Sequence, residues 1–479
     1  MKYECRTYDI VKTNKGDNMR QREHSERQSM KNCSMIKIAT LVVLLAGTVH
    51  VGIGQTTFSI STTGTILKNG QPWFPMGFYI DRSTVASYTS QVNAIAAAGA
   101  FNVINLPYGS GDWNVFLNLC SSKGIYVVSQ LDYSGDFTAA VNTYKGHAAM
   151  YAWSVADDAD NGYFTTTQLR DRNTQVKNAD ANHPTETSLT GYYLGRRQAA
   201  DNYTSIADVA CYQCYPITPP ANYDVTAANA LTETYLRTLT YVKSSEKVHR
   251  PMIMNTQYFS WGGQSPNPRY PTAAEVRNMT YSGLAAGIKG IIAYTYSANL
   301  TSQIEEWAEI KALRADVTRL EGALLGGTLT RLTTGDQEVV VSLWDYRDTA
   351  FIVAINTSYS ATKTLNQTIP GTHSGPAQAV FARFPTGLIF TNNRLAGQIQ
   401  PQGVHMYKLM KSGGTGIGSS DQIRGSAIGK YGENTGLYYS LNGRKLTPAS
   451  GDAKNLFLQV VIRHGKVNGR QTFDKFIYK

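Results

Sequence analysis

At 479 residues the chain is long enough for two or three domains, and 42% hydrophobic with 16% charged residues excludes a disordered protein. The net charge of +11 comes from the two ends: residues 1–54 carry 9 basic and 5 acidic side chains, and residues 411–479 carry 11 and 4. Residues 55–410 hold 25 of each sign, and this neutral body argues against nucleic acid as a partner.

The first 54 residues predict a leader for export. Residues 38–49 are a short apolar run, preceded by basic residues and followed by Gly52-Ile53-Gly54. A positive flank, a short apolar run and small residues after it are typical of a secretory signal peptide, here cut after Gly54. The run is too short to span a bilayer and no other segment is long enough, so no stable membrane span is expected.

Five cysteines are present, but Cys5 and Cys33 would leave with the leader. Cys211 and Cys214 have the spacing of a redox or zinc half-motif, yet they lie on a predicted strand, where residues three apart face opposite sides. With Cys120 they are expected to be buried thiols.

No cofactor is expected. The histidines of the middle of the chain, His147, His183 and His249, are scattered and lack the spacing of a metal site. No phosphate-binding loop and no Gly-x-Ser-x-Gly turn is present.

Residues 55–327 alternate short apolar runs with amphipathic stretches, which is typical of a parallel sheet covered by helices. Predicted strands cover 74–79, 102–106, 125–131, 152–156, 183–190, 205–215, 251–257 and 290–296. Predicted helices cover 90–98, 113–122, 137–144, 165–179, 227–244, 272–286 and 305–320. Eight strand–helix units in about 270 residues predict an α/β fold of the (β/α)8 TIM-barrel type.

The sequence pattern changes after residue 327, where helical periods no longer occur between the apolar runs. Runs at 339–344, 351–355, 379–384 and 404–409 predict strands separated by turns, which indicates a small antiparallel β-sandwich over 328–410. Residues 411–420 are rich in Gly and Ser and are expected to be a flexible linker. Residues 421–479 favour short strands again and predict a C-terminal β module.

The fourth predicted strand of the barrel ends in three acidic residues, Asp157, Asp158 and Asp160. A buried strand that delivers carboxylates at its C-terminal end is how a parallel barrel presents an active site. The alternative is that these acids cap the following helix or lie in solvent.

The period of two along this strand assigns its faces. Ser154, Ala156 and Asp158 would share the face toward the barrel interior, which suits small residues. Trp153 and Val155 would share the face toward the helices. Asp158 would then point into the mouth of the barrel.

Other strand ends would bring aromatic and polar residues to the same mouth. Aromatic rings stack on the apolar faces of sugars while polar groups bind their hydroxyls, so a polysaccharide or oligosaccharide is the expected partner. The candidate sugar-binding residues are Tyr79, Asp81, Tyr108, Tyr215, Gln257, Trp261 and Tyr296, and Asp132 is a further acid at the mouth.

The segments 74–79, 152–160, 254–259 and 287–296 resemble barrel-type glycoside hydrolases. The most similar pattern belongs to a poorly characterised bacterial group whose fourth strand ends in Ala-Asp-Glu-Pro-Asp. Asp157 matches the first Asp of that motif and Asp158 replaces the Glu, which in such barrels is the acid/base. The resemblance therefore implies Asp158 as the general acid.

This chain departs from that pattern on the seventh strand, where the family has a nucleophilic glutamate. Here the inward positions are Asn255 and Gln257, and an amide cannot act as the nucleophile. The ordinary retaining pair is therefore not expected.

Three modes of action remain open. Asp158 could be the acid of an inverting pair with Asp132 or Asp81 across the sugar. Alternatively, Asp157 and Asp158 together could support substrate-assisted cleavage of an N-acetylated sugar. The third possibility is a catalytically inactive surface protein that binds glycan without cleaving it.

The C-terminal segment resembles the sorting domain of bacterial type IX secretion. The similar features are the strand-like run at 438–446 with Asn442-Gly443, a strand at 456–462 and the Lys-ended run at 475–479. The resemblance implies the type IX secretion machinery as a partner. It also implies passage through the periplasm to the cell surface or the medium.

Overall fold

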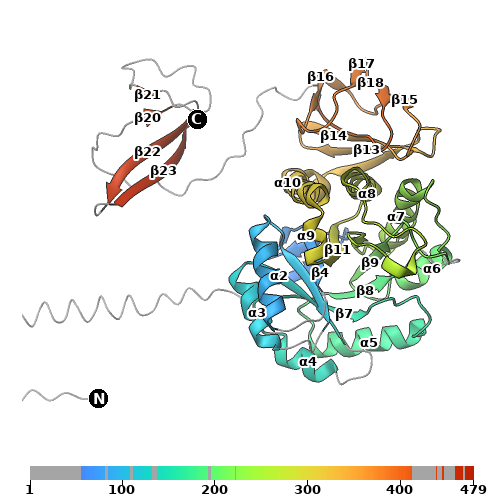
Figure 1. The fold of residues 1–479 in the computed structure, drawn as a ribbon, viewed down its shortest axis with the longest axis vertical. Helices are drawn as coiled ribbons and strands as arrows, with labels where there is room; N and C mark the ends of the chain where they lie inside the picture. The colour runs from blue at the N-terminus through green and yellow to red at the C-terminus, as the bar shows by residue number, and fades with distance from the viewer. Residues whose placement is uncertain are drawn as a thin grey trace, which may run out of the picture. The chain divides into compact units, whose positions relative to one another are not determined.

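Eight parallel strands close into a barrel in the computed structural model of this chain (Figure 1). The structure describes residues 56–80, 85–107, 112–131, 137–191, 196–221 and 223–412, together with strands of the C-terminal segment. The barrel strands are β4 (Met76–Ile80), β5 (Val103–Pro107), β6 (Tyr126–Gln130), β7 (Met150–Ala156), β8 (Thr185–Leu189), β9 (Val209–Cys214), β10 (Met252–Thr256) and β11 (Gly290–Tyr296). Each pairs with the next, and β11 pairs with β4, so the predicted (β/α)8 barrel is confirmed.

Helices follow the strands and cover the outside of the barrel (Figure 1). They are α2 (Val85–Ala97), α3 (Trp113–Ser122), α4 (Phe137–Tyr144), α5 (Thr166–Ala179), α6 (Arg196–Tyr203), α7 (Ala230–Glu246), α8 (Ala273–Ala286), α9 (Ala298–Ser302), α10 (Ile304–Gly326) and the 3-10 turn η1 (Gly262–Gln264). All the predicted helices are present. The short helices α6 and α9 were not predicted, because neither sequence has the apolar period of an amphipathic helix.

The start of α5, directly after the acidic loop, is fixed by a capping box. The Thr165 side chain accepts a hydrogen bond from the Gln168 backbone, and the Gln168 side chain accepts one from the Thr165 backbone. Both bonds satisfy amide groups that the helix itself leaves unpaired. They therefore hold the chain that leads from β7 into α5.

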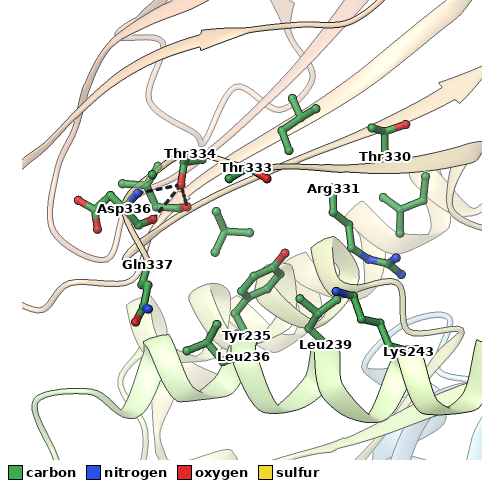
Figure 2. Close-up of a pocket in the computed structure, with 15 residues that line it drawn as sticks. Tyr235, Leu236, Leu239, Lys243, Thr330, Arg331, Thr333, Thr334, Asp336 and Gln337 are labelled. Carbon is green, nitrogen blue, oxygen red and sulfur yellow. Dashed lines mark hydrogen bonds between the residues drawn. The ribbon is translucent and has the colours of Figure 1, made fainter.

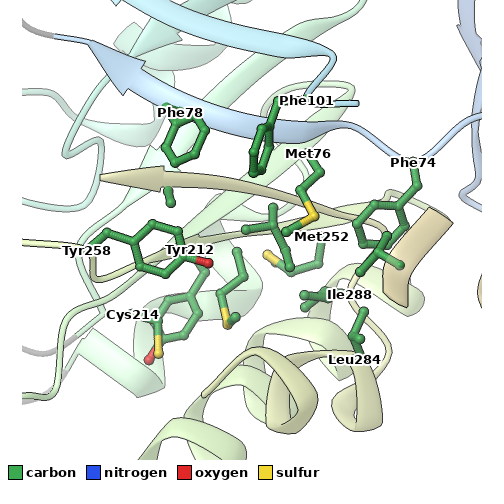
Figure 3. Close-up of a cluster of buried hydrophobic side chains, with 14 of the residues drawn as sticks. Phe74, Met76, Phe78, Phe101, Tyr212, Cys214, Met252, Tyr258, Leu284 and Ile288 are labelled. Carbon is green, nitrogen blue, oxygen red and sulfur yellow. The ribbon is translucent and has the colours of Figure 1, made fainter. Parts of the chain in front are cut away.

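A layer of fully buried side chains lies between the barrel wall and the outer helices (Figure 3). Met76 and Phe78, alternate residues of β4, point into this layer, and Met252 of β10 lies in it as well. Leu284 and Ile288 close it from α8 and the turn that follows. Burying each such side chain contributes on the order of 2 kcal/mol, so this layer keeps the strand ends in place.

A three-stranded sheet that the sequence pattern did not predict closes the amino-terminal end of the barrel. Its strands are β1 (Phe58–Ile60), β2 (Ile66–Lys68) and β3 (Gln71–Pro72). Phe58 and Trp73 pack edge-on against Tyr151 with ring centroids 5.0 Å away. Tyr151 lies at the amino-terminal end of β7, so the opposite, carboxyl end is the one left for a ligand.

The antiparallel sheets predicted after the barrel are present. One has the order β12-β13-β14-β19-β16 and the other β15-β18-β17, with a separate apolar core between them. Their bounds are β12 (Thr328–Leu332), β13 (Val339–Tyr346), β14 (Thr349–Asn356), β15 (Lys363–Thr368), β16 (His373–Ala379), β17 (Leu388–Thr391), β18 (Arg394–Ile399) and β19 (Val404–Lys411).

The predicted strand at 379–384 is wrong. Strand β16 ends at Ala379, and the following residues form a turn. Phe381 and Phe384 are apolar because they are buried against barrel helices, with Phe384 5.2 Å from the ring of Tyr281 on α8. The apolar run therefore reflects packing between domains and not strand formation.

Ion pairs join the sandwich to helices α8 and α10, which lie beneath it (Figure 1). The Arg383 guanidinium lies 2.6 Å from Glu309 and also contacts Asp316. Arg277 of α8 binds Glu309 as well, at 2.7 Å. Barrel and sandwich belong to one compact unit.

The C-terminal segment belongs to a second unit. Strands β20 (Tyr438–Tyr439) and β21 (Lys445–Leu446) pair antiparallel, as do β22 (Gln459–Val467) and β23 (Arg470–Tyr478). Strands are thus present where the sequence predicted them, while the Asn442-Gly443 turn lies outside the described residues. No helix in the described part of the chain is both long and apolar enough to cross a bilayer.

Candidate active site

A register shift near the end of β7 decides which acids face the barrel interior. Ser154 and Ala156 pair with consecutive residues of β8, so Val155 is one residue too many and forms a bulge. After the bulge the alternation is reversed, and Ala156 packs in the outer layer with Trp153 and Val155. The expectation that Ala156 faces inward is therefore wrong, whereas that for Trp153 and Val155 is confirmed.

The carboxyl groups of Asp157 and Asp158 meet at one amide. Gln213 Nε2, on β9, lies 2.5 Å from Asp158 Oδ1 and 3.3 Å from Asp157 Oδ1. It also donates to Ser188 Oγ at 3.1 Å. Asp158 has a positive φ of 49°, a left-handed conformation that allows two consecutive side chains to turn toward the same partner. Both acids are therefore at the carboxyl end of the barrel strands.

Burial and mutual repulsion favour the protonated forms of this pair. Burial, and next the charge of Asp158, raise the pKa of Asp157 to about 7. Burial also raises the pKa of Asp158, while the hydrogen bond from Gln213 opposes this shift. A carboxyl with a raised pKa keeps its proton to higher pH and can give it to a leaving group, which is what a general acid must do.

The third acid of the cluster has a structural role. Asp160 is 1% exposed, and its Oδ1 accepts hydrogen bonds from the Thr190 backbone at 2.8 Å and the Thr190 hydroxyl at 2.9 Å. These bonds tie the loop after β7 to the end of β8. Asp160 neither caps α5 nor lies in solvent.

A group of aromatic rings lies near the acid pair. Tyr294, 36% exposed, lies 5.7 Å from Tyr79, 6.0 Å from Tyr215 and 5.3 Å from Phe259 between ring centroids. Trp261 continues the group, 4.9 Å from Phe259. Burial, and next the charge of Asp157, raise the pKa of Tyr215, which lies beside the acids. This combination of rings and carboxyls suits a sugar.

Tyr296, expected at the mouth, packs in the outer layer instead. Its ring lies 5.7 Å from both Phe78 and Trp307. The pairing of β11 with β4 shifts register between Ala293 and Tyr296, so the simple alternation from Tyr294 does not hold.

Gln257, another expected sugar ligand, is fully buried. Its amide accepts from the Ile217 backbone N–H at 2.8 Å and donates to the carbonyls of Ile217 and Phe259 at 3.0 and 3.1 Å. These bonds hold the loops that carry Tyr215 and Trp261. Gln257 therefore positions the aromatic residues.

The remaining expectations divide in two. Asp81, Tyr108 and Asp132 lie outside the described residues. On β10, Asn255 faces the interior as expected and donates to the Tyr79 hydroxyl at 3.0 Å.

The sequence pattern missed two interior residues, Gln213 and Glu186. Glu186 of β8 is fully buried, and neither carboxyl oxygen has a hydrogen-bond partner among the described residues. The predicted strands 183–190 and 205–215 contained both residues. The signal that could have found them is their interior parity, shared with Ser188 and Cys211.

Cys120, Cys211 and Cys214 are buried thiols outside any disulfide, as expected. Cys211 lies in the interior cluster and Cys214 in the outer layer, which confirms that they face opposite sides of β9. Within the described ranges, no group of three or more His, Cys, Asp and Glu side chains has the arrangement of a metal site.

A groove of about 680 Å³ lies away from the acid pair, between α7 and the strands β12 and β13 (Figure 2). Tyr235, Leu236 and Leu239 of α7 form its apolar side, and Thr330 and Arg331 of β12 lie opposite (Figure 2). It is built from a helix flank and a sheet edge and contains none of the strand-end acids. Size alone therefore does not identify the reactive site.

No family model matches this sequence, and no curated protein does. Several solved structures do match. The chain is similar to a protein described as a glycoside hydrolase, at 13% identity and a TM-score of 0.54 over 75% of this chain and 97% of that chain.

Two further similar structures are named more fully. One is a glycoside hydrolase family 5 protein from Bacteroides vulgatus, at 13% identity and a TM-score of 0.50, covering 74% of this chain and 94% of that one. The other is a family 27 β-L-arabinopyranosidase from Geobacillus stearothermophilus, at 10% identity and a TM-score of 0.50, covering 72% and 98%. At these identities the similarity shows the fold: this chain has a glycoside hydrolase-like barrel.

Proposed function

We propose that this protein is an exported glycoside hydrolase that acts on a polysaccharide or oligosaccharide, with Asp158 as the general acid. The observation that carries the proposal is the pair of adjacent carboxyls at the carboxyl end of β7, joined through the Gln213 amide. The glycoside hydrolase-like fold supports the substrate class. The aromatic rim of Tyr79, Tyr215 and Tyr294 supports a sugar in this position.

The geometry favours a mode in which Asp157 and Asp158 act together. Their Oδ1 atoms lie 3.3 and 2.5 Å from the same nitrogen, so they are within about 5.8 Å of each other. An inverting acid and base need about 6.5–9.5 Å, so these two acids are not such a pair. β10 carries Asn255 where a retaining enzyme of this kind has its nucleophile.

Substrate-assisted cleavage of an N-acetylated sugar uses adjacent acids in different roles. Asp158 protonates the glycosidic oxygen as the bond to the anomeric carbon breaks. The acetamido oxygen of the substrate forms a bond to that carbon, and Asp157 accepts a hydrogen bond from the acetamido N–H. Water then attacks the anomeric carbon, the bond from that carbon to the acetamido oxygen breaks, and the proton of the water goes to Asp158, which regenerates the acid and frees the N-acetylated sugar.

Asp158→Asn and Asp157→Asn should be compared with the wild type on a panel of glycans with and without 2-acetamido groups. Loss of a general acid should lower kcat/KM by about 10²–10⁴, and less for substrates with an activated leaving group. Asp201→Asn, at an exposed ion pair with Lys247, is the matched control and should be neutral. Unchanged hydrolysis by Asp158→Asn would remove Asp158 from the mechanism.

The second candidate is a surface protein that binds glycan without cleaving it. The favouring observation is that both inward polar residues near the end of β10 are amides engaged in the fold, Asn255 with Tyr79 and Gln257 with Ile217. Calorimetry on the same panel separates the two functions. Binding that is lost in Trp261→Ala, with no hydrolysis of any glycan by the wild type, would favour the binder.

For localisation we propose that residues 1–54 direct export and that residues 421–479 direct type IX sorting. The antiparallel pairing of β22 with β23 is compatible with a strand-based sorting domain. Deletion of 421–479 should trap the protein in the periplasm. Normal release of the truncated chain would contradict this.

A further inference from the structure

Glu186 is a carboxyl group inside the barrel that the proposed reaction does not use. It lies on β8, next to Ser154 of β7 in the parallel register. It is 0% exposed, and both of its oxygens lack a hydrogen-bond partner in the part of the chain that the structure describes. An ionised carboxylate in such a place carries a large desolvation cost, whereas the neutral acid carries a much smaller one.

The groups that face Glu186 do not favour its charged form. They are Tyr79 from β4, Tyr151 from β7, Asp157 directly after β7, and Cys211 from β9, all of which interact with Glu186 electrostatically. Each of these groups is neutral or negative in every protonation state. None of these facing groups is a cation that could stabilise the Glu186 carboxylate. Protonation is therefore the way in which its charge is neutralised.

We propose that Glu186 is a positioning residue for the candidate acid pair: it holds a proton in the barrel interior beside Asp157 and so confines negative charge to the mouth. The inference rests on the proposed function for its catalytic meaning. The claim that Glu186 is a neutral acid that interacts with Asp157 does not depend on any substrate.

The coupling runs in both directions. Burial, and next the charge of Asp157, raise the pKa of Glu186 to about 8. Because the two groups share one interaction energy, a charge on Glu186 would in turn hold a proton on Asp157. With Glu186 neutral, no further buried charge adds to the repulsion on Asp157, so Asp157 ionises at a lower pH than it would beside a charged Glu186. A glutamate that only fills space would have no such effect.

The first experiment reads the proton on Glu186 directly, by infrared spectroscopy of the full chain between pH 5 and pH 9. The wild type should show carbonyl absorption of protonated carboxylic acids at pH 7, and the wild-type minus Glu186→Gln difference spectrum should contain one band that belongs to Glu186. Glu275→Gln is the matched control, because Glu275 is also buried but is ionised beside Arg269, so its loss should leave the band unchanged.

The second variant is Asp157→Asn, which keeps Glu186 and removes its charged neighbour. The midpoint at which the Glu186 band disappears should fall by about one pH unit. The proposal is overturned if the band is absent from the wild type at pH 7. It is also overturned if Glu186→Gln gives the same absorption as the wild type, or if Asp157→Asn leaves the midpoint unchanged.

The third reading connects the proton to catalysis. In Glu186→Gln the upper limb of the pH profile of kcat/KM should move to lower pH, with kcat at pH 5–6 retained. An unshifted limb would overturn the positioning role. The wild type could hydrolyse no glycan and still give the expected infrared results. The proposed hydrolysis would then be wrong, and the assignment of Glu186 as a neutral acid beside Asp157 would hold.

Discussion

Gln213 is the residue on which the acid pair depends most directly, because one amide nitrogen contacts both carboxyls. Its hydrogen bonds stabilise the charged forms and so lower both pKa values against the effect of burial. A hydrogen bond to a charged group contributes about 1.5–3 kcal/mol. Gln213 therefore sets how far the two acids stay protonated as pH rises.

Gln213→Leu should raise the pKa of Asp158 and of Asp157 by about one unit, since the donor is lost while burial remains. The acid form would persist to higher pH, and the upper limb of the activity profile should move in that direction. Carboxyl titration by NMR measures the same shift without substrate. Gln175→Leu, on the exposed face of α5, is the control. An upper limb that moves to lower pH would contradict the arrangement.

Glu186 gives a stability prediction at the same scale. Its folded pKa of about 8 lies above the unfolded value of about 4.3. Between these pH values the folded state binds the extra proton, so the contribution of Glu186 to stability falls as pH rises, by up to about 1.4 kcal/mol per unit. Above pH 8 both states are ionised and the loss is complete.

The unfolding free energy of Glu186→Gln relative to the wild type should therefore increase from pH 4.5 to pH 8. Denaturant unfolding at several pH values measures the difference. Glu275→Gln should behave in the opposite sense, because its ion pair with Arg269 lowers the folded pKa of Glu275 and stabilises the protein above pH 4.5. A pH-independent difference for Glu186→Gln would contradict a neutral buried acid.

At the scale of elements, the bulge in β7 and the start of α5 bracket the acidic loop. The bulge at Val155 sends Asp157 inward, and the bonds from Thr190 to Asp160 hold the loop after it. The Thr165 capping box then begins α5. The loop between two fixed points has little freedom, which is what a pre-organised acid pair requires.

Thr165→Ala should destabilise the protein by about 1 kcal/mol, because the Gln168 backbone N–H loses its acceptor. Thermal or denaturant unfolding measures the change. Thr165→Ser keeps the hydroxyl and is the matched control, expected to be near the wild type. Equal stability of the Ala and Ser variants would show that the cap contributes nothing.

At the scale of the whole molecule, the barrel and the sandwich share one interface of charges and rings. Glu309 and Asp316 of α10 are buried acids, and Arg383 from the sandwich is their partner. Phe384 beside it packs on Tyr281. The sandwich therefore braces the face of the barrel formed by α8 and α10, and does not reach the acid pair through any residue named above.

Arg383→Met should destabilise the molecule by about 3 kcal/mol, the low end for a buried pair because the Arg383 side chain is 26% exposed. We expect calorimetry to show the barrel and the sandwich unfolding in one transition in the wild type and in two transitions in the variant. Arg394→Met is the control, since this arginine bonds exposed groups within the sandwich. A single transition at the wild-type temperature would contradict a bracing role for Arg383.

Much of the fold was predictable because it depends on local period. Alternating apolar runs and amphipathic stretches located all eight barrel strands, and the acids at the end of the fourth strand indicated which end of the barrel to consider. The opposite faces of Cys211 and Cys214 followed from the same period. Position along a strand is a property that a sequence carries by itself.

Only the tertiary structure decided the direction of side chains at the positions where pairing between strands overrides that period. The bulge at Val155 and the register shift before Tyr296 arise from hydrogen bonding to neighbouring strands, which no local pattern records. They turned Asp157 inward and Tyr296 outward. Gln213 and Glu186 became partners of the acids only when parallel pairing placed β7, β8 and β9 side by side, because pairing between strands joins residues that are distant in the chain.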